Sequence, residues 1–339
     1  YLPGKEPHAR EKRLIFKNID RAGYNPSIEC YMENGGYEQL KKAFTMERSA
    51  ITNEVKASGL RGRGGAGFPT GVKWGFIPPT NTKPVYLICN ADESEPGTFK
   101  DRYIIHQDPH QLIEGIMISA WANNVKQAYI YIRGEMPHGA RILEKAIAEA
   151  RAANLVGPNI LGSSYSCEIY VHRGAGAYIC GEESAMIESI EGKRGEPRLR
   201  PPYIAEVGLF GRPTLEHNFE TLYWIRELLE QGADSFAAHG RHGRKGLRRF
   251  SVSGRVKQPG VKLAPAGITL RELVDEYCGG MAEGHTLYAY LPGGASGGIL
   301  PARLADMPLD FDTLQPHGCF IGSAAVMVLS QHDSARDAA

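Results

Sequence analysis

Residues 59–75 read GLRGRGGAGFPTGVKWG, and residues 62–67 within them match the pattern G-x-G-x-x-G. In the usual dinucleotide-binding fold this pattern follows a strand and opens a helix. Here residues 49–58 are polar with two apolar side chains four positions apart, which predicts a helix before the glycines. Pro69 follows too soon for an ordinary helix to open there. The stretch therefore predicts a glycine loop outside a Rossmann context.

The same loop combines three features that suit a nucleotide or a flavin. Clustered glycines expose backbone N–H groups and let a flat or anionic ligand approach closely. Cationic side chains suit phosphate, and aromatic rings suit the stacking of a planar ring. These side chains are Arg61, Arg63, Lys73, Phe68, Trp74 and Phe76. A mobile glycine loop with solvated arginines is the alternative.

The composition is that of an ordinary globular chain. Of the 339 residues, 42% are apolar and 23% are charged, and the formal net charge is +1. This balance gives no broad electrostatic case for nucleic acid or an anionic membrane, and no apolar run approaches the ~20 residues of a spanning helix. The six cysteines are scattered without a C-x-x-C pair, which favours reduced, intracellular thiols. Tyr1 indicates that the natural start lies upstream.

The first half of the chain predicts a mostly parallel α/β sheet. Residues 1–36 contain several breakers and predict an extended arm. Strands and helices then alternate, as is typical of parallel sheets. The predicted elements are a helix starting at 37–44, a strand at 85–91, a helix opened by Asp108-Pro109, a strand at 128–132, a helix at 137–152 and a strand at 167–171.

The second half begins with another glycine stretch. Residues 174–184 precede a predicted helix that stops at Gly192, and residues 195–202 form a basic, proline-rich surface loop. A further helix is predicted at 215–229.

A change in composition follows. Residues 239–249 are strongly basic, and we interpret them as a solvated connector, with a phosphate or polyanion patch as the alternative. From residue 250, short strands and turns predict a small β-rich α+β domain that ends near residue 310. Residues 324–329 begin a new apolar segment.

Polar side chains gather where open α/β sheets bind ligands, beyond the carboxyl ends of the strands. Asn90, Asp92, Glu93 and Glu95 follow the strand at 85–91. Three carboxylates repel a bare phosphate, and they suit a cation or a hydroxyl-rich partner such as ribose or a ribityl chain. Decoration of a helix N-terminus is the alternative. The same alternative applies to the later acids, Glu182 and Glu183.

Three other patterns lack the context that their chemistry needs. Residues 294–298 match G-x-S-x-G, but Pro301 follows within a β-rich region, so a tight glycine turn is the better interpretation. His106 and His110 are separated by Asp108-Pro109 and lack further zinc ligands. No G-K-[S/T] occurs, which excludes a P-loop.

Three long motifs make the chain resemble a known family. They are GRGGAGFPTGVKW at 62–74, CNADESEPG at 89–97 and GAGAYICGEES at 174–184. They resemble the flavin- and NADH-binding subunit of respiratory complex I, shared with the diaphorase subunits of NAD-reducing hydrogenases and NAD-dependent formate dehydrogenases. The resemblance covers nearly the whole chain.

The resemblance implies a fold and its division. It implies an arm at 1–36, a non-Rossmann α/β domain that binds FMN and NADH at 37–240, and a ubiquitin-like α+β domain of the soluble-ligand-binding type at 248–310. Residues 311–339 would begin a helical iron–sulfur domain. The cysteines of its four-iron, four-sulfur cluster would follow Ala339, so no metal ligand is expected among the residues given.

The resemblance also implies the site residues. FMN would be held by Gly62, Arg63, Gly64, Lys73, Asn90, Asp92, Glu93, Tyr178, Gly181, Glu182, Glu183, Asn218 and Thr221. NADH would be held by Gly65, Phe68, Phe76, Glu95, Glu183 and Tyr203, with its adenine against the two phenylalanines. The hydride chemistry would belong to the flavin, and no side chain is expected to act as an obligatory acid or base.

The implied function is an NAD(H)-dependent flavin oxidoreductase subunit. It would exchange hydride between NAD(H) and FMN, and single electrons with iron–sulfur partner subunits that include a thioredoxin-like two-iron subunit. Binding of nucleic acid and direct membrane insertion are not expected. The location would be cytoplasmic, or peripheral on the cytoplasmic or matrix side of a membrane complex. A non-catalytic scaffold subunit is the alternative of another class.

Besides the cluster segment, two places in the chain depart from the common pattern of this family. Arg200 and Tyr203 replace a more common lysine and phenylalanine, and Glu216-His217-Asn218 replaces a more usual Val-Asn-Asn. His217 therefore alters one expected flavin contact. These departures favour a soluble formate dehydrogenase or hydrogenase relative over complex I. The preferred host is an NAD-dependent formate dehydrogenase, with the equivalent subunit of complex I or of an NAD-reducing hydrogenase as the alternative.

Overall fold

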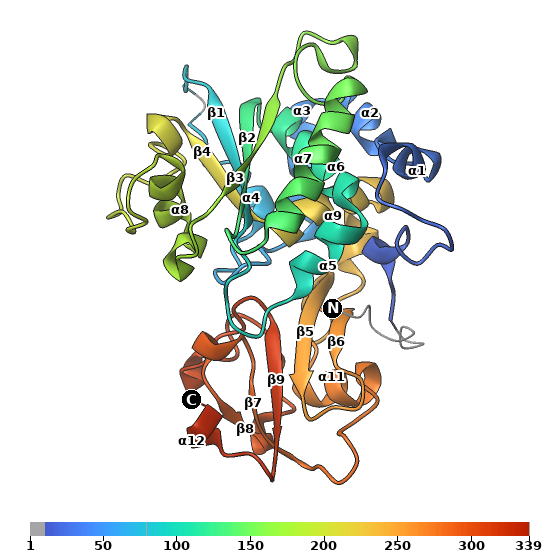
Figure 1. The fold of residues 1–339 in the computed structure, drawn as a ribbon, viewed down its shortest axis with the longest axis vertical. Coiled ribbons are helices and arrows are strands. Elements are labelled where there is room, and N and C mark those ends of the chain that lie inside the picture. Colours follow the sequence, from blue (N-terminus) through green and yellow to red (C-terminus); the bar gives the residue numbers. More distant parts are fainter. Residues whose placement is uncertain (1–10, 79, 339) are drawn as a thin grey trace.

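The computed structural model describes residues 11–78 and 80–338. Figure 1 shows two parts stacked along the long axis, an upper one with a sheet between helices and a lower one built on a second sheet. The predicted fold class, an α/β domain followed by a smaller α+β domain, is confirmed.

The upper sheet is parallel throughout, with the strand order β3-β2-β1-β4. Its strands are β1 (Val85–Ala91), β2 (Val125–Ile132), β3 (Glu168–Arg173) and β4 (Thr214–Asn218). β1 is buried over most of its length, as expected for an apolar strand covered on both faces.

Helices cover both faces of this sheet (Figure 1). On one face lie α3 (Arg48–Ser58), α6 (Pro109–Ala122), α7 (Pro137–Ala152) and α9 (Phe219–Gln231). α8 (Glu183–Ile190) packs on the other face. The remaining upper helices are α1 (Ile28–Glu33), α2 (Glu38–Phe44), α4 (Thr70–Trp74), α5 (Lys100–Gln107) and α10 (Ala233–Ala237).

Two segments of the upper part differ from their predictions. Residues 214–218 form β4, not the start of a helix at 215–229, because they pair in parallel with Tyr86–Asn90 of β1. Asn218 then caps α9 by accepting a hydrogen bond from the backbone N–H of Glu220. Within the predicted extended arm, residues 11–36 contain a 3₁₀ turn at Leu14–Phe16 and the helix α1, and they bury the side chains of Phe16 and Tyr31. Residues 1–10 lie outside the described part.

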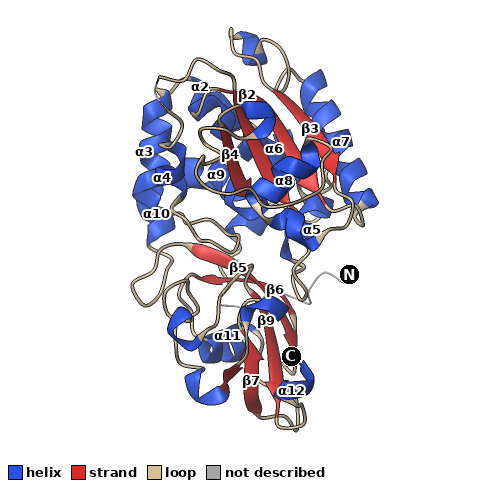
Figure 2. Cartoon of the chain, turned by 90° about the vertical axis from the view of Figure 1, so that its left-hand side faces the viewer, coloured by secondary structure: helices blue, strands red, loops and turns tan. Residues whose placement is uncertain are grey.

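The lower part is a five-stranded mixed sheet with the order β6-β5-β9-β7-β8 (Figure 2). Its elements are β5 (Leu247–Gly254), β6 (Gly260–Pro265), α11 (Leu270–Tyr277), β7 (Leu287–Leu291), β8 (Leu300–Pro301), β9 (Ala325–Ser330) and α12 (Ala335–Ala338). The helix α11 opens with a capping box made by Thr269 and Glu272.

Two expectations for the lower part need correction. The apolar segment near 324–329, expected at the start of a helical domain, is β9, which lies between β5 and β7 and runs parallel to β5. The predicted solvated connector at 239–249 ends inside β5, where Arg248 and Arg249 are buried. In both segments the structure is determined by pairing with strands that are distant in the sequence.

A buried charge cluster joins the two parts. Lys100 Nζ lies 2.9 Å from Asp101 Oδ1 and 3.0 Å from Glu220 Oε2. Arg249, from the lower sheet, contacts Asp101 at 2.7 Å and Glu220 at 3.4 Å. All four side chains are at most 4% exposed. Because buried charges need partners, this cluster fixes β5 against α5 and the start of α9.

Candidate functional site

The candidate site lies where the strand order of the upper sheet reverses. The connections after β1 and β2 lead to neighbours on one side of β1, whereas the connection after β3 leads to β4 on its other side. Asn90, near the end of β1, is in register with Asn218 at the end of β4. Ligands of open α/β sheets bind at such a switch point, beyond the carboxyl ends of the strands.

The glycine loop lies between helices α3 and α4 and not directly after a strand, which confirms the predicted departure from the Rossmann context. Its arms are joined by hydrogen bonds from the backbone N–H of Gly62 to Phe68 O (2.8 Å) and of Thr70 to Leu60 O (2.9 Å). Gly67 has φ +59°, and a Cβ there would lie 2.3 Å from the Phe311 ring. Only glycine fits this turn against the lower part.

The tip of the loop is held at the start of α9. The backbone N–H of Arg63 donates to Thr221 Oγ1 (2.9 Å), and a Cβ on Gly64 would lie 3.5 Å from Asn218 Cβ. The Arg63 guanidinium instead extends to the lower part and donates to Leu247 O (2.7 Å). The structure thus brings four predicted flavin residues together at this point, while it directs the Arg63 side chain elsewhere.

Lys73 is the cationic centre of the site. Its Nζ lies 3.2 Å from both Glu183 Oε2 and Glu216 Oε2. Although burial opposes the charge, Glu216 and Glu183 raise the pKa of Lys73. Arg200 adds a second cation, 3.0 Å from Glu183 Oε1 and paired with Glu182. The charges therefore fix one another before any ligand binds.

Glu216 is a site residue that the sequence reasoning did not assign. Its Oε1 accepts a hydrogen bond from Asn90 Nδ2 (2.9 Å), so that it links Asn90 to Lys73. The signal was present in the departure at 216–218, but only strand alternation shows which side chain faces the site. His217 points to the opposite face, where its Nε2 accepts from Trp74 Nε1 (2.9 Å). Burial holds the pKa of His217 well below its usual range, which keeps the ring neutral.

Asp92 lies beside the second glycine stretch. A Cβ on Gly181 would be 3.5 Å from Asp92 Oδ2, and this buried oxygen has no hydrogen-bond partner among the described residues. Burial raises the pKa of Asp92 to about 6. Glu182, in contrast, is engaged as the N-cap of α8, accepting from the backbone N–H groups of Ser184 and Ala185.

We expect Asp92→Asn to change how stability depends on pH. The pKa is raised in the folded chain, to about 6, above the ~3.9 of an unfolded aspartate. The fold therefore favours the protonated acid, and stability falls as pH rises between these two values. Urea unfolding of the flavin-free protein from pH 4 to 7 measures this slope. The asparagine variant should lose part of it, and an identical slope would contradict the assignment.

The predicted flavin residue Glu93 has its carboxylate bound by the start of α5. Its carboxylate accepts from the backbone N–H of Asp101 (2.7 Å) and from Arg102 Nε (2.8 Å). These groups belong to the first turn of α5, where a carboxylate is favoured. The side chain thus connects the loop that carries Asn90 and Asp92 to the start of α5.

The Glu95 carboxylate is held by hydrogen bonds from the lower part of the molecule. Its Oε1 accepts from the backbone N–H of Ser296 (2.8 Å), and its Oε2 accepts from Ser296 Oγ (2.9 Å) and from Tyr178 OH. Ser296 lies in the glycine turn at 294–298, a single 3₁₀ turn with Gly294 and Gly298 at positive φ. The prediction of a tight turn there is confirmed, and sequence alone gave no reason to connect it with Glu95.

Aromatic rings stand at the edge of the site. Phe68 and Phe76 are 42% and 49% exposed, and their ring centroids are 5.4 Å apart. Tyr178 and Tyr203 are more than half exposed. Because several exposed apolar side chains close together often mark a ligand-binding surface, this group suits a planar ligand.

The residues present fit a flavin nucleotide. The glycine loop leaves open space next to Gly65, and the absence of a side chain at Gly64 lets a ligand lie close to the backbone there. The unpartnered Asp92 oxygen suits a hydroxyl donor, and the fixed Lys73 suits an electron-rich ring edge or an anion. Within residues 11–78 and 80–338, no group of three or more His, Cys, Asp or Glu side chains is placed to hold a metal ion. No helix in the same ranges is long and apolar enough to cross a membrane.

Two family models match this chain. The model described as the Nuo51 FMN-binding domain matches residues 55–227, and the SLBB domain matches residues 249–300. The first range contains the glycine loop, the switch point and most of α9. The second contains the turn at 294–298, which hydrogen-bonds to Glu95.

Curated relatives match over most of the chain. An NADH-quinone oxidoreductase component of Rhizobium meliloti (strain 1021) is 48% identical over 317 residues, which are 93% of this chain and 75% of that protein. NADH dehydrogenase (ubiquinone) flavoprotein 1, mitochondrial, of Dictyostelium discoideum is 46% identical over 326 residues, 95% and 68% of the two chains.

A solved structure shows the same fold. The crystal structure of an NAD+-reducing NiFe hydrogenase in the H2-reduced state superposes with a TM-score of 0.74 at 40% identity. The match covers 85% of this chain and spans 47% of that chain.

Proposed function

Because the chain belongs to the family of FMN-binding flavoprotein subunits of NAD(H)-dependent oxidoreductases, we propose that it exchanges hydride between NAD(H) and FMN at the β1–β4 switch point. When bound, the flavin supplies the hydride chemistry and its conversion to single-electron transfer. The observation that carries the proposal is the meeting of Lys73, Asn90, Asp92 and the glycine loop at this edge of the sheet.

The chain's own residues would bind and orient. Gly62, Gly64, Asn218 and Thr221 would form the phosphate end, where the loop meets the start of α9. Lys73, Asn90 and Asp92 would hold the polar edge and the hydroxyl chain. No described side chain needs to move a proton obligatorily.

The NAD(H) side would be formed by the exposed rings and two acids. Phe68, Phe76 and Tyr203 offer ring faces for the nucleotide bases. Glu95 and Glu183 would accept hydrogen bonds from hydroxyl or amide groups, each already oriented by its protein partners.

The visible spectrum of the purified protein tests this function. We expect a flavin band near ~450 nm that bleaches on anaerobic addition of NADH, since the flavin carries the hydride chemistry. A band that does not respond to NADH would contradict NADH as the donor. No band, even after reconstitution with FMN, would favour a scaffold subunit without turnover.

Ser296→Ala should weaken NADH handling without removing FMN. The variant deletes the hydroxyl that donates to Glu95 Oε2 while the backbone N–H remains. A hydrogen bond to a charged group is worth about 1.5–3 kcal/mol, but Glu95 keeps the Ser296 backbone N–H and Tyr178 OH as donors. We therefore expect about 1 kcal/mol or less to be lost, which is a roughly fivefold rise in KM for NADH. Steady-state kinetics measure it, with exposed Ser235→Ala as control. An unchanged KM would show that the Ser296 hydroxyl does not position Glu95 for NADH.

We further propose a soluble NAD-dependent formate dehydrogenase as the host enzyme. Support comes from Arg200, Tyr203 and Glu216-His217, which depart from the pattern common to complex I. Electrons would pass to iron–sulfur clusters, one in a segment that follows residue 339 and others on partner subunits, including a thioredoxin-like two-iron subunit. The location would be the cytoplasm.

Purification of the native complex tests the host. Formate-dependent NAD+ reduction by the co-purified subunits is the expected result. Hydrogen-dependent reduction would assign the chain to a hydrogenase, and NADH oxidation coupled to quinone would assign it to a complex I-type enzyme. Either of these two results would overturn the formate proposal and leave the flavin function intact.

A further inference from the structure

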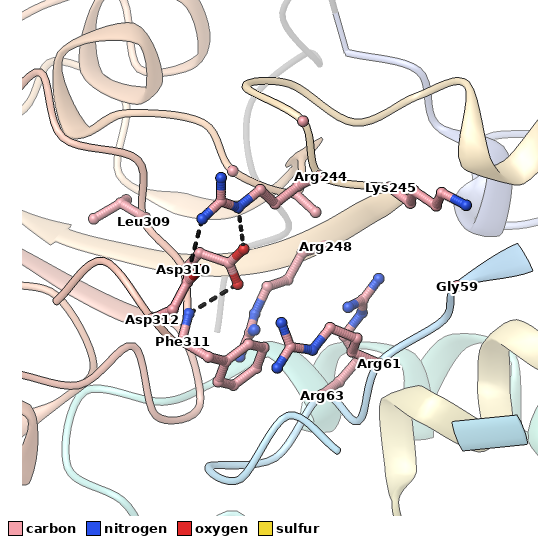
Figure 3. Close-up of a pocket in the computed structure, with 13 residues that line it drawn as sticks. Gly59, Arg61, Arg63, Arg244, Lys245, Arg248, Leu309, Asp310, Phe311 and Asp312 are labelled. Atoms are coloured by element: carbon pink, nitrogen blue, oxygen red, sulfur yellow. Dashed lines mark hydrogen bonds and ion pairs between the residues drawn. The ribbon is translucent and has the colours of Figure 1, made fainter. Parts of the chain in front are cut away.

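A cavity of about 330 Å³ lies behind the glycine loop, between the two parts (Figure 3). Its walls come from the start of the loop, from the basic segment that leads into β5, from residues 266–267 after β6 and from residues 309–312. Five cationic side chains line it, namely Arg61, Arg63, Arg244, Lys245 and Arg248. The lining shares only Arg63 with the predicted flavin residues, so the cavity is separate from the switch-point site.

Carboxylates balance only one of these cations. Arg244 forms ion pairs with both carboxylates that line the cavity. Its Nε lies 2.6 Å from Asp310, and a terminal nitrogen lies 2.7 Å from Asp312. The other four form no ion pair with a carboxylate among the described residues. The cavity therefore carries an excess of positive charge.

Two of these four cations are buried and have hydrogen-bond donors without partners among the described residues. Arg63 and Arg248 are each 2% exposed, and the Nε–H of each has no hydrogen-bond partner among the described residues. Each donates from one terminal nitrogen to a single backbone carbonyl, that of Leu247 and that of Gly322, both at 2.7 Å. Burial, together with the neighbouring Arg63, lowers the pKa of Arg248 to about 10. Buried charges left in this condition are costly.

Phe311 arranges the guanidinium groups without neutralising them. Its ring centroid is 4.7 Å from the Arg61 carbon Cζ and 4.9 Å from that of Arg248. In Figure 3 the side chains of Arg61 and Arg248 lie beside this ring. A cation–π contact stabilises each group by about 0.5–2 kcal/mol but leaves the N–H donors free for an acceptor.

We propose that this cavity binds a phosphate dianion, either free phosphate or the phosphoryl group of a small phosphomonoester. Guanidinium forks match the oxygens of a phosphate and form strong charge-assisted hydrogen bonds. The volume is at the lower end of the ~300–1,000 Å³ typical of small-molecule sites, which suits a small anion and excludes a dinucleotide. The alternative phosphate-binding interpretation of residues 239–249 thus applies to Arg244, Lys245 and Arg248. This inference does not depend on the flavin function.

Isothermal titration of FMN-saturated protein with inorganic phosphate, at constant pH and ionic strength set with chloride, tests the site. We expect saturable binding at one site in the native protein and at least tenfold weaker binding in Arg248→Gln. The matched control is Arg271→Gln, which removes an exposed arginine of the same part, paired with Asp306. It should bind phosphate as the native protein does.

Further variants and ligands keep the test decisive. If Arg248→Gln does not fold, Lys245→Gln replaces it, because Lys245 is exposed at the cavity rim. It should weaken binding severalfold. Displacement of phosphate by glycerol 3-phosphate would assign the site to phosphomonoesters, and its failure would assign it to free phosphate. Absence of saturable binding, or unchanged binding in the cavity variants, overturns the proposal.

Discussion

Replacing Arg249 by methionine is expected to lower the free energy of unfolding by about 3–5 kcal/mol, the usual cost of breaking a buried ion cluster from one side. Arg249 contacts Asp101 and Glu220, and its own side chain is fully buried. After the change, two buried carboxylates share Lys100 alone. Although burial opposes its ionised form, Arg249 and Lys100 hold the pKa of Glu220 well below its usual range.

Urea unfolding followed by tryptophan fluorescence measures this loss. The control is Arg271→Met, where an exposed pair contributes about 0–1 kcal/mol. The depressed pKa of Glu220 also predicts how stability depends on pH. The stabilisation by Glu220 is fully present above the unfolded pKa of ~4.3 and is lost as the pH falls toward the folded pKa. A cost below 1 kcal/mol at pH 7 would show that the two parts are not joined by these charges.

Lys73→Met should weaken FMN binding by about 10- to 100-fold, which corresponds to the 1.5–3 kcal/mol of a hydrogen bond to a charged group. The change also leaves Glu183 and Glu216 close together without the cation that separates them. Quenching of FMN fluorescence during a titration with the flavin-free protein measures the affinity.

A second variant separates binding from folding. Lys73→Met combined with Glu216→Val removes both partners, and it should restore stability while the FMN affinity stays low. Lys42→Met, which removes a lysine that donates to Leu229 O on the far side of α9, is the control. Recovery of FMN affinity in the double variant would show that Lys73 acts only by neutralising Glu216.

Local sequence predicted the elements whose signals are contained within them. The apolar run at 85–91 is β1, and Asp108-Pro109 opens α6 where expected. The five residues of β4 are too few and too polar to show a strand pattern, and pairing with β1, more than a hundred residues earlier in the chain, decides their structure. Acidic residues at 92–95 were predicted as site residues because they follow a strand end.

Local sequence could not predict the directions of those side chains. Glu93 turns to the first turn of α5, and Glu95 is fixed by Ser296, about two hundred residues later. Such contacts arise only when α5 and the lower sheet are placed against the loop. The same limit applies to Arg248, whose charge reads as solvated until β5 is known to be buried.

The central position of β9 has a consequence for synthesis on the ribosome. β5 pairs with β9 from Ser251 to Gly254, so its partner emerges about 75 residues later. At a rate of ~5–20 residues per second, β5 has an open hydrogen-bonding edge for roughly 4–15 s. β7, whose partners in β9 follow about 40 residues later, has one for roughly 2–8 s. Such edges recruit other strands. The nascent chain is therefore most exposed to aggregation just after the turn that carries Ser296 is made, and before the strand that closes the sheet.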